Sequence, residues 1–202
     1  GGMPFLGDAA LGAGGSALTL QNGAQIRVFS NAPTPTPVEI SRPIVVGTGG
    51  GEIRAGGSTP LTVSSVISGT GKMRWFYPGT IVVNAASTHT GETEIESATI
   101  RLTGPNGSWQ SPFVRVLNRL DLETGNNNRI RDDATIALHG GTLVVGSTGG
   151  NYQETIGTLE LREGHSNMTL VGGGAGPTVL TATSLTRNPG GGLFVRGLNV
   201  GA

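Results

Sequence analysis

The sequence predicts an all-β fold in which many short strands coil into a β-solenoid. The only sustained hydrophobic rhythm has period two, which indicates strands, and no helical apolar period of any length is present. About seventeen runs of β-forming residues, mostly about three to five residues long, are each closed by Gly, Asn or Ser. Such strands are too many and too short for an ordinary sandwich. They suit a solenoid, because the inward Leu, Val or Ile of each coil stacks on the equivalent residue of the next.

The amino-acid composition excludes several classes of function. The 202 residues include 36 Gly, 11 Pro and no Cys, and the formal net charge is +0. Lys72 is the only lysine and the arginines are scattered singly, so the chain lacks the basic patch that nucleic-acid binding requires. Without Cys, a disulfide scaffold and a Cys-ligated metal site are excluded. No apolar run approaches the roughly 18 residues of a membrane span. Because residue 1 is Gly and not Met, we expect a processed product or a piece of a longer chain.

The first third of the chain alternates between strands and turns. Residues 1–16 are small and Gly-rich, and we interpret them as a linker or an edge coil. Strands are expected at 17–20 and 24–28, separated by Gln21-Asn22-Gly23, a turn sequence that tolerates positive φ. Prolines alternate through 33–37; since proline cannot donate to a ladder, this segment is expected as a loop or an edge. The next strands are expected at 41–46 and 52–54.

The stretch 61–102 is the most regular part, and the pattern resumes beyond it. Within the stretch, strands are expected at 61–63, 80–83, 93–95 and 99–102. Further strands are expected at 114–116, 120–122, 135–138, 142–145, 155–161, 168–171, 179–181, 184–186 and 193–195. Both ends of the chain look like uncapped coil sequence, which predicts open β-edges.

Four motifs in this stretch follow one another in a characteristic order. They are VISGTGK at 66–72, PGTIVVN at 78–84, TGETEI at 90–95 and ATIRL at 98–102. In this order they resemble the autotransporter-associated β-strand repeat, also called the passenger-associated transport repeat. The resemblance extends over most of residues 11–171. His89 stands where the family has an aromatic residue, Ser97-Ala98 replaces Ala-Gly, and Trp75-Phe76-Tyr77 is bulkier than the family pattern.

The resemblance implies a right-handed parallel β-helix in a secreted bacterial surface protein. It also implies that the chain belongs to a stalk and not to a catalytic head. We therefore expect one β-helix domain over 17–202, with 61–102 as its best repeat match.

Acidic residues supply one candidate site. Glu92, Glu94 and Glu96 alternate, so a strand would place all three carboxylates on one face. They could bind Ca²⁺ or act as an acid/base pair on a polysaccharide. The favoured interpretation is a solvated outer face, with Thr93 and Ile95 pointing inward.

Other polar residues give weaker signals. Asp132-Asp133, near Arg129 and Arg131, are expected to form a local ion-pair cluster and not a metal site. The histidines, His89, His139 and His165, lie far apart in different contexts and are expected at the surface or in turns. A zinc site would require them to converge. We therefore expect neither a metal site nor a cofactor.

The few aromatic residues are concentrated in one region. Trp75, Phe76, Tyr77 and Trp109 could contact a glycan or form a subunit interface, because large aromatic side chains dominate interface energetics. They could equally fill the core of a wider coil.

These observations favour a non-enzymatic structural module of an extracellular bacterial fibre, sheath or adhesin stalk. Self-association is expected through coil ends or a donated strand, with a cell-surface glycan as a possible further partner. Two alternatives stay open: a β-helical polysaccharide-degrading enzyme that uses the three glutamates, and a glycan-binding adhesin that uses Trp75 and Tyr77.

Overall fold

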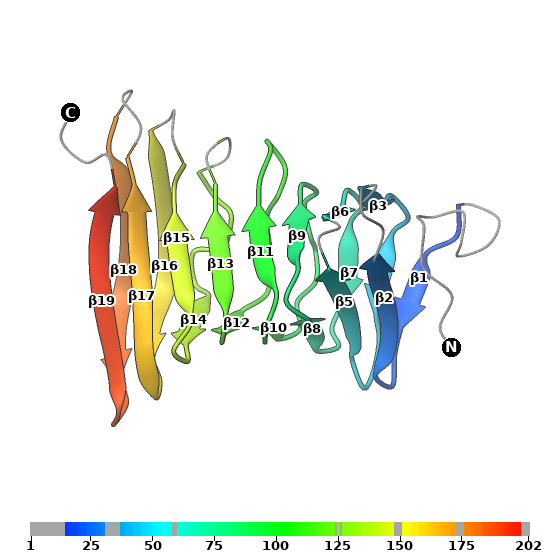
Figure 1. Cartoon of the computed structure of the whole chain (residues 1–202), viewed down its shortest axis with the longest axis horizontal. Helices are drawn as coiled ribbons and strands as arrows, with labels where there is room; N and C mark the ends of the chain where they lie inside the picture. Colours follow the sequence, from blue (N-terminus) through cyan, green and yellow to red (C-terminus); the bar gives the residue numbers. More distant parts are fainter. Residues whose placement is uncertain are drawn as a thin grey trace.

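The computed structural model describes residues 15–30, 37–57, 60–123, 125, 127–147, 151–172 and 176–198. All regular structure in these ranges is β, and every strand pairing is parallel. The predicted all-β parallel solenoid is therefore confirmed, and it makes about seven turns (Figure 1). Most of the linker expected at 1–16, most of the proline segment 33–37 and the start of the resemblance at 11–14 lie outside the described residues.

The strands are β1 (Leu18–Leu20), β2 (Ala24–Ser30), β3 (Val38–Ile40), β4 (Ile44–Val46), β5 (Gly51–Gly57), β6 (Leu61–Val63), β7 (Ile67–Gly69), β8 (Met73–Phe76), β9 (Thr80–Val83), β10 (Thr93–Ile95), β11 (Thr99–Leu102), β12 (Phe113–Val116), β13 (Arg119–Leu122), β14 (Thr135–Leu138), β15 (Thr142–Val145), β16 (Tyr152–Leu161), β17 (Gly164–Val171), β18 (Thr178–Arg187) and β19 (Gly191–Leu198).

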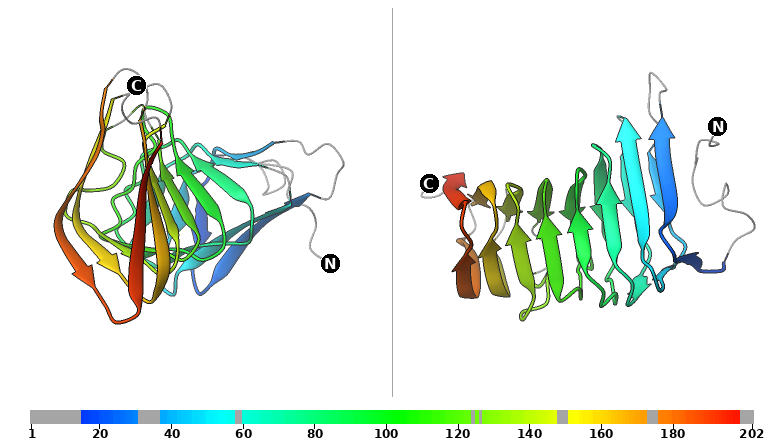
Figure 2. Two further views of the ribbon diagram at one scale, coloured as in Figure 1. Left: turned by 60° about the vertical axis from the view of Figure 1, so that its left-hand side comes forward. Right: turned by 90° about the horizontal axis from the view of Figure 1, so that it is seen from below.

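Two long sheets run the length of the solenoid. Long sheet 1 has the order β18-β16-β14-β12-β10-β8-β5-β2, and long sheet 2 has the order β19-β17-β15-β13-β11-β9-β6-β3. A short sheet, β1-β4-β7, closes the third side of the first three coils. Figure 2 shows the strands stacked along one axis, with β1–β3 at one end of the rod and β18–β19 at the other. We call β1–β3 the first coil and β18–β19 the last coil.

Inward side chains form straight rows because paired strands keep one register. In long sheet 1, Ile53 pairs with Trp75, Trp75 pairs with Ile95, and Ile95 pairs with Val116. All four side chains are buried, whereas their neighbours along the strands point outward. Alternation along each strand therefore places one set of rows in the core and the other on the surface.

The coils differ in length. Partners in long sheet 1 are 27 residues apart at the start (Ala24 and Gly51), 20 in the middle (Trp75 and Ile95) and 26 at the end (Leu161 and Arg187). Among the described residues of the middle coils, the third side has no strand; isolated bridges there join Ala86 to Ser108 and Trp109 to Ile130. Strands thus define two sides of these coils and turns define the third.

Close approach of coils explains several corner glycines. A Cβ on Gly71 would lie 1.9 Å from the carbonyl oxygen of Gly47, and one on Gly91 would lie 2.1 Å from that of Gly71. Real Cβ contacts are never so short, so only glycine allows these turns to stack directly. Gly71 and Gly91 thus lie at corners where the chain turns between strands and successive coils touch.

Some element boundaries differ from the prediction. The sequence pattern did not indicate β3, because the prolines before it disguise a three-residue strand. Trp75 and Phe76 lie within β8, in register with β5 and β10. At the C-terminal end, one ten-residue strand, β18, replaces the two short strands expected at 179–181 and 184–186.

Candidate functional site

The three alternating glutamates lie on the outer face of long sheet 1. Thr93 and Ile95 of β10 are buried beneath them, as the favoured interpretation expected. Glu94 itself is largely covered by its neighbours, while Glu92 and Glu96 are partly exposed. The carboxylates therefore face outward but are embedded in other side chains.

Those side chains form a row of alternating charge across successive coils. The pairings align Gln25 with Glu52, Glu52 with Arg74, Arg74 with Glu94 and Glu94 with Arg115. Gln25 donates from Nε2 to Glu52 Oε2 at 2.9 Å, and Arg74 donates to both Glu52 and Glu94. Opposite charges directly across paired strands stabilise a sheet, so this row contributes to coil stacking.

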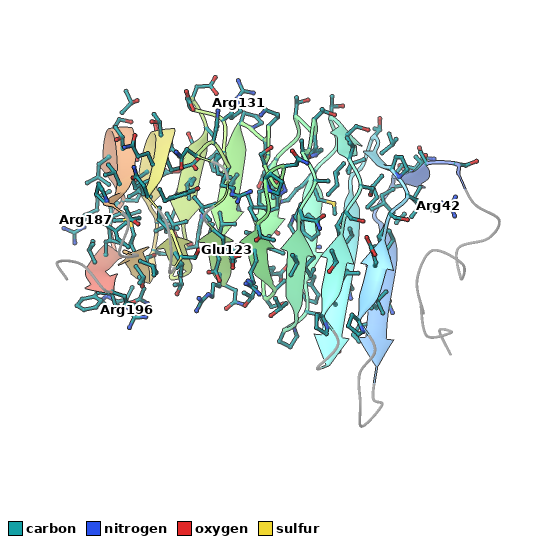
Figure 3. All side chains as sticks on the ribbon, turned by 90° about the horizontal axis from the view of Figure 1, so that it is seen from above. Arg42, Glu123, Arg131, Arg187 and Arg196 are labelled. Carbon is teal, nitrogen blue, oxygen red and sulfur yellow. The ribbon has the colours of Figure 1, made fainter. Side chains whose placement is uncertain are left out.

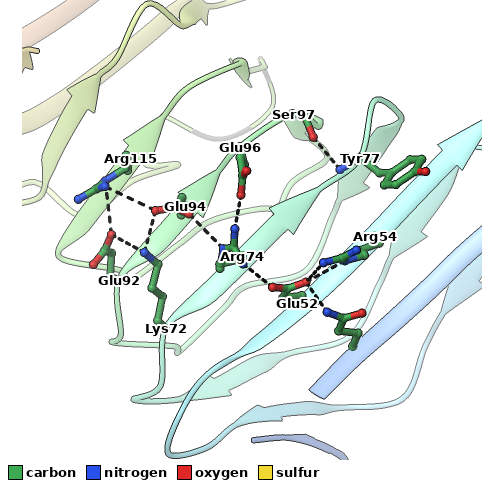
Figure 4. Close-up of polar contacts among 11 residues, drawn as sticks. Glu52, Arg54, Lys72, Arg74, Tyr77, Glu92, Glu94, Glu96, Ser97 and Arg115 are labelled. Carbon is green, nitrogen blue, oxygen red and sulfur yellow. Dashed lines mark hydrogen bonds and ion pairs between the residues drawn. The ribbon is translucent and has the colours of Figure 1, made fainter. Parts of the chain in front are cut away.

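Flanking residues complete what we call the charge ladder (Gln25, Glu52, Arg54, Lys72, Arg74, Glu92, Glu94, Glu96 and Arg115; Figure 4). Lys72 Nζ lies 2.7 Å from Glu94 Oε2 and 3.3 Å from Glu92 Oε1. Arg54 pairs with Glu52 at 2.7 Å, and Arg74 also binds Glu96. Each carboxylate of the ladder is thus matched by a cation within the ladder.

This pairing disfavours acid catalysis at Glu94. Partial burial alone would raise the pKa of Glu94, but hydrogen bonds and charges from Lys72 and Arg74 outweigh burial and hold the pKa below its usual value. A general acid in glycoside hydrolysis needs a raised pKa. Within the described ranges, no group of three or more His, Asp or Glu residues could hold a metal ion.

The four aromatic candidates divide into an interior pair and a surface pair. Trp75 and Trp109 are 1% and 3% exposed, and their rings stack with centroids 5.8 Å apart and planes at 15°. They fill the core, the alternative that the sequence left open, so neither ring faces a ligand. Phe76 and Tyr77 lie at the surface, and the predicted glycan or interface contact stays a prediction for them.

The surface pair belongs to a small aromatic group at the end of β2, β5 and β8. Tyr77 is 40% exposed and has a φ of 84°. Its ring contacts the Phe29 ring edge-on, with the ring centroids 4.8 Å apart. The Arg54 guanidinium lies 4.6 Å from the Phe76 ring centroid. Gly56 leaves room for the rings, because a Cβ there would lie 2.6 Å from Phe29.

The structure corrects the expectation for one histidine. His89 is 3% exposed, and its Nε2 lies 2.6 Å from the carbonyl oxygen of Gly71. Burial lowers the pKa of His89, while the hydrogen bond to Gly71 opposes this shift. His89 therefore packs inside the coil, at the position where the repeat that the motifs resemble has an aromatic residue. The His139 side chain is only 12% exposed, and its Nδ1 lies 3.3 Å from Oε1 of the exposed Glu163.

The cluster expected around Asp132-Asp133 is only partly formed. Arg131 and Asp133 make an exposed ion pair, as expected. Arg129, however, is fully buried. It donates from Nη1 to Gly107 O at 2.6 Å and from Nε to Glu123 O at 2.9 Å.

Arg129 is part of a buried polar network that the sequence pattern did not reveal. Glu154 accepts hydrogen bonds from the backbone N–H of Arg129 at 3.0 Å, from that of Ile130 at 2.8 Å and from the Tyr152 hydroxyl at 2.5 Å. Burial raises the pKa of Glu154 and of Tyr152 and lowers that of Arg129. The available signal was the alternation of Tyr152, Glu154 and Ile156 along β16, which places all three side chains inward.

Exposed apolar side chains gather on the last coil. Leu185 is 63% exposed, Phe194 62% and Val195 50%, with Val179 and Leu198 also exposed. Leu185 continues the inner row of Leu159, and Val195 continues that of Met168. Figure 3 shows Arg187 and Arg196 on the same coil. The last coil thus presents a face that other coils bury against a neighbour.

The described residues form a parallel β-solenoid with a self-neutralised charge ladder on its side and exposed apolar side chains on β18 and β19. The chain matches no family model, no curated protein and no solved structure. Its assignment to the autotransporter-associated repeat therefore stays a prediction from the motifs. The described residues contain no helix long and apolar enough to cross a membrane.

Proposed function

We propose that the chain is a non-enzymatic structural module of an extracellular bacterial fibre, sheath or adhesin stalk, which self-associates through its coil ends. The observation that carries the proposal is the exposure of core-type side chains on the last coil, above all Leu185 and Val195. Covering them with another β-coil would remove apolar surface from water and would pair the strand edges of β18 and β19.

The sides of the solenoid support the same proposal. Cations of the charge ladder match its carboxylates, so long sheet 1 presents little unpaired charge over the middle coils. Such a surface suits a rod that extends by adding coils, since each new coil needs contacts only with its neighbour. The extracellular, bacterial setting rests on the motif resemblance alone.

Sedimentation velocity of the purified chain over a wide concentration range tests the proposal. We expect polymers whose size grows with concentration and which resist dissociation by SDS, because they would be joined by backbone ladders. A chain that stays monomeric at the highest accessible concentration would overturn the proposal.

A second candidate function is glycan binding at the aromatic group of Phe29, Phe76 and Tyr77. The observation that favours it is the exposed Tyr77 ring beside Arg54 and Phe76. Binding to a panel of cell-surface glycans should weaken in a Tyr77→Ala variant and persist in Phe194→Ala, which removes an exposed aromatic ring elsewhere. Equal binding by both variants would exclude this site.

A further inference from the structure

We propose that the last coil of one copy docks on the first coil of a second copy, head to tail, so that both long sheets continue between molecules. This inference rests on the proposed self-association and adds to it the partner surface and the register. It commits to one arrangement, which side-chain rows, charges and backbone edges each support.

The rows of long sheet 2 specify the register. The inner row that ends at Val195 begins at Val38, and it passes through Leu61, Ile81, Ile100, Leu120, Leu143 and Met168. The adjacent outer row ends at Arg196 and begins at Glu39. If each row simply continues into the next molecule, Val195 lies beside Val38 and Arg196 beside Glu39.

This register makes three successive positions complementary. Phe194, which is 62% exposed, meets Pro37, an exposed residue directly before β3. Val195 meets Val38, and Arg196 meets the exposed carboxylate of Glu39. Opposite charges directly across paired strands attract, and an aromatic ring covers apolar proline surface. In long sheet 1 the same rule places Leu185 against the small side chain of Ala24.

Charge argues against the opposite arrangement, in which two last coils face each other. The charged residues of β18 and β19 are Arg187 and Arg196, with no Asp or Glu in either strand. Two last coils would therefore bring only cations together, whereas the first coil offers Glu39 in line with Arg196; the cation of the first coil, Arg27, lies on β2 in the other long sheet. Charge complementarity thus selects the first coil as the partner of the last.

Backbone directions agree with this register. Val38 N donates to Pro60 O at 3.1 Å and Ile40 O accepts from Ser64 N at 3.0 Å, so both residues face the second coil and Glu39 faces away from it. On β19, the carbonyl of Leu198 accepts from Gly172 N, so by alternation the polar groups of Val195 face away from β17. Glu39 N–H can then donate to Val195 O.

The first coil is ready to accept an edge without rearranging its core. Its inner side chains are already buried, with Val38 6% and Ile26 7% exposed. New contacts there fall on the strand edge and on exposed outer side chains, Pro37 and Glu39. Pro37 lacks an N–H, which removes one donor from the edge but leaves its carbonyl able to accept from Val195.

Charge reversal tests the register. Arg196→Glu and Glu39→Arg should each raise the concentration required for polymer formation by about tenfold or more, because like charges then oppose each other across the contact. The double variant should restore polymers at close to the wild-type concentration. Arg131→Glu, on a turn in the middle of the rod, should assemble normally. Thermal melts monitored by circular dichroism confirm that each monomer is folded.

Cysteine cross-linking gives a second, independent readout, because the chain has no cysteine of its own. A Phe194→Cys/Pro37→Cys double variant should form a ladder of disulfide-linked multimers under mild oxidation, since paired positions on adjacent strands lie within disulfide reach. Each single variant should give no ladder.

The outcomes separate this inference from the broader proposal. One outcome is that the wild type forms polymers, both charge-reversal variants assemble equally well and the double-cysteine variant gives no disulfide-linked multimers. This result would overturn the head-to-tail register and leave the proposed self-association in place. A Phe194→Cys single variant that cross-links efficiently into dimers, and into nothing larger, would indicate that the last coils of two copies pack against each other. That result would also overturn the head-to-tail register. A strictly monomeric wild type would overturn both.

Discussion

Buried polar side chains stabilise the turns that close the middle coils. Arg129, Tyr152 and Glu154 link the turn after β13 to the start of β16 where no strand forms the third side. A buried charge is tolerable only when its partners remain. The stability of this region should therefore depend on the complete network and not on any one pair.

An Arg129→Met variant tests this dependence. Removing the guanidinium leaves the carbonyls of Gly107 and Glu123 without their donor and takes a nearby positive charge away from the buried Glu154 carboxylate, which should lower the free energy of unfolding by about 3–5 kcal/mol. Urea denaturation measures the change. Arg131→Met, at an exposed ion pair, should have little effect, and an Arg129→Met/Glu154→Gln double variant should recover part of the loss. Equal, small effects from both single variants would contradict the assigned role.

His89 should make the solenoid sensitive to acid. Burial lowers the pKa of His89 in the folded chain, whereas the unfolded chain has a pKa of about 6.5. The unfolded state therefore binds more protons near and below this pH, so the stability contributed by neutral His89 is present above about pH 6.5 and is lost as pH falls through the lowered pKa.

Urea denaturation between pH 8 and pH 5 measures this effect. The wild type should lose stability across the range, and His89→Phe, which places a non-titrating aromatic ring at this buried position, should lose less. His165→Phe, at an exposed position of β17, controls for the removal of a histidine. An unchanged pH slope in His89→Phe would show that other groups account for the acid sensitivity.

Turns with stacked glycines hold successive coils at sheet spacing. Gly91→Val should lower the free energy of unfolding by roughly 2 kcal/mol or more, because a side chain would displace the backbone of Gly71 and Thr70. Gly140→Ala is the control, because a Cβ at Gly140 would meet no atom within 4 Å. This variant should lose only about 1 kcal/mol of stability, since alanine disfavours the left-handed φ of 71° at this position. Equal costs at both sites would contradict direct stacking of the turns.

The charge ladder of long sheet 1 is expected to stabilise and not to catalyse. Glu94→Gln should lower stability by about 1 kcal/mol at low salt and by less at high salt, because Lys72 and Arg74 lose a shared carboxylate. Urea denaturation at two salt concentrations measures this. Incubation of the wild type with acidic and neutral polysaccharides should yield no products. Turnover that disappears in Glu94→Gln would instead establish the enzyme alternative.

At the scale of the molecule, the local hydrophobic pattern of the sequence is enough to predict the fold. It does not predict the contacts between coils. Period-two runs closed by Gly and Asn define strands and corners wherever they occur, so the solenoid and the outward face of Glu94 follow from the sequence. The stacking of Trp75 on Trp109 depends on a coil length that changes along the chain, which no local pattern encodes. Arg129 looks like a surface residue in sequence, because its partners lie in neighbouring coils.

The ends of the rod differ in a way that only the structure reveals. The first coil already buries its inner side chains, whereas Leu185 and Val195 of the last coil remain exposed. In the proposed assembly, each junction would therefore join unlike ends. Such a polymer would keep all its strands perpendicular to one axis.

Cryo-electron microscopy of the purified chain at high concentration tests the central claim most directly. We expect rods longer than one solenoid, in which strands lie perpendicular to the rod axis at a spacing of about 4.8 Å that continues unbroken through each junction. Dispersed single solenoids at every concentration, or fibres whose strands run along the axis, would contradict it.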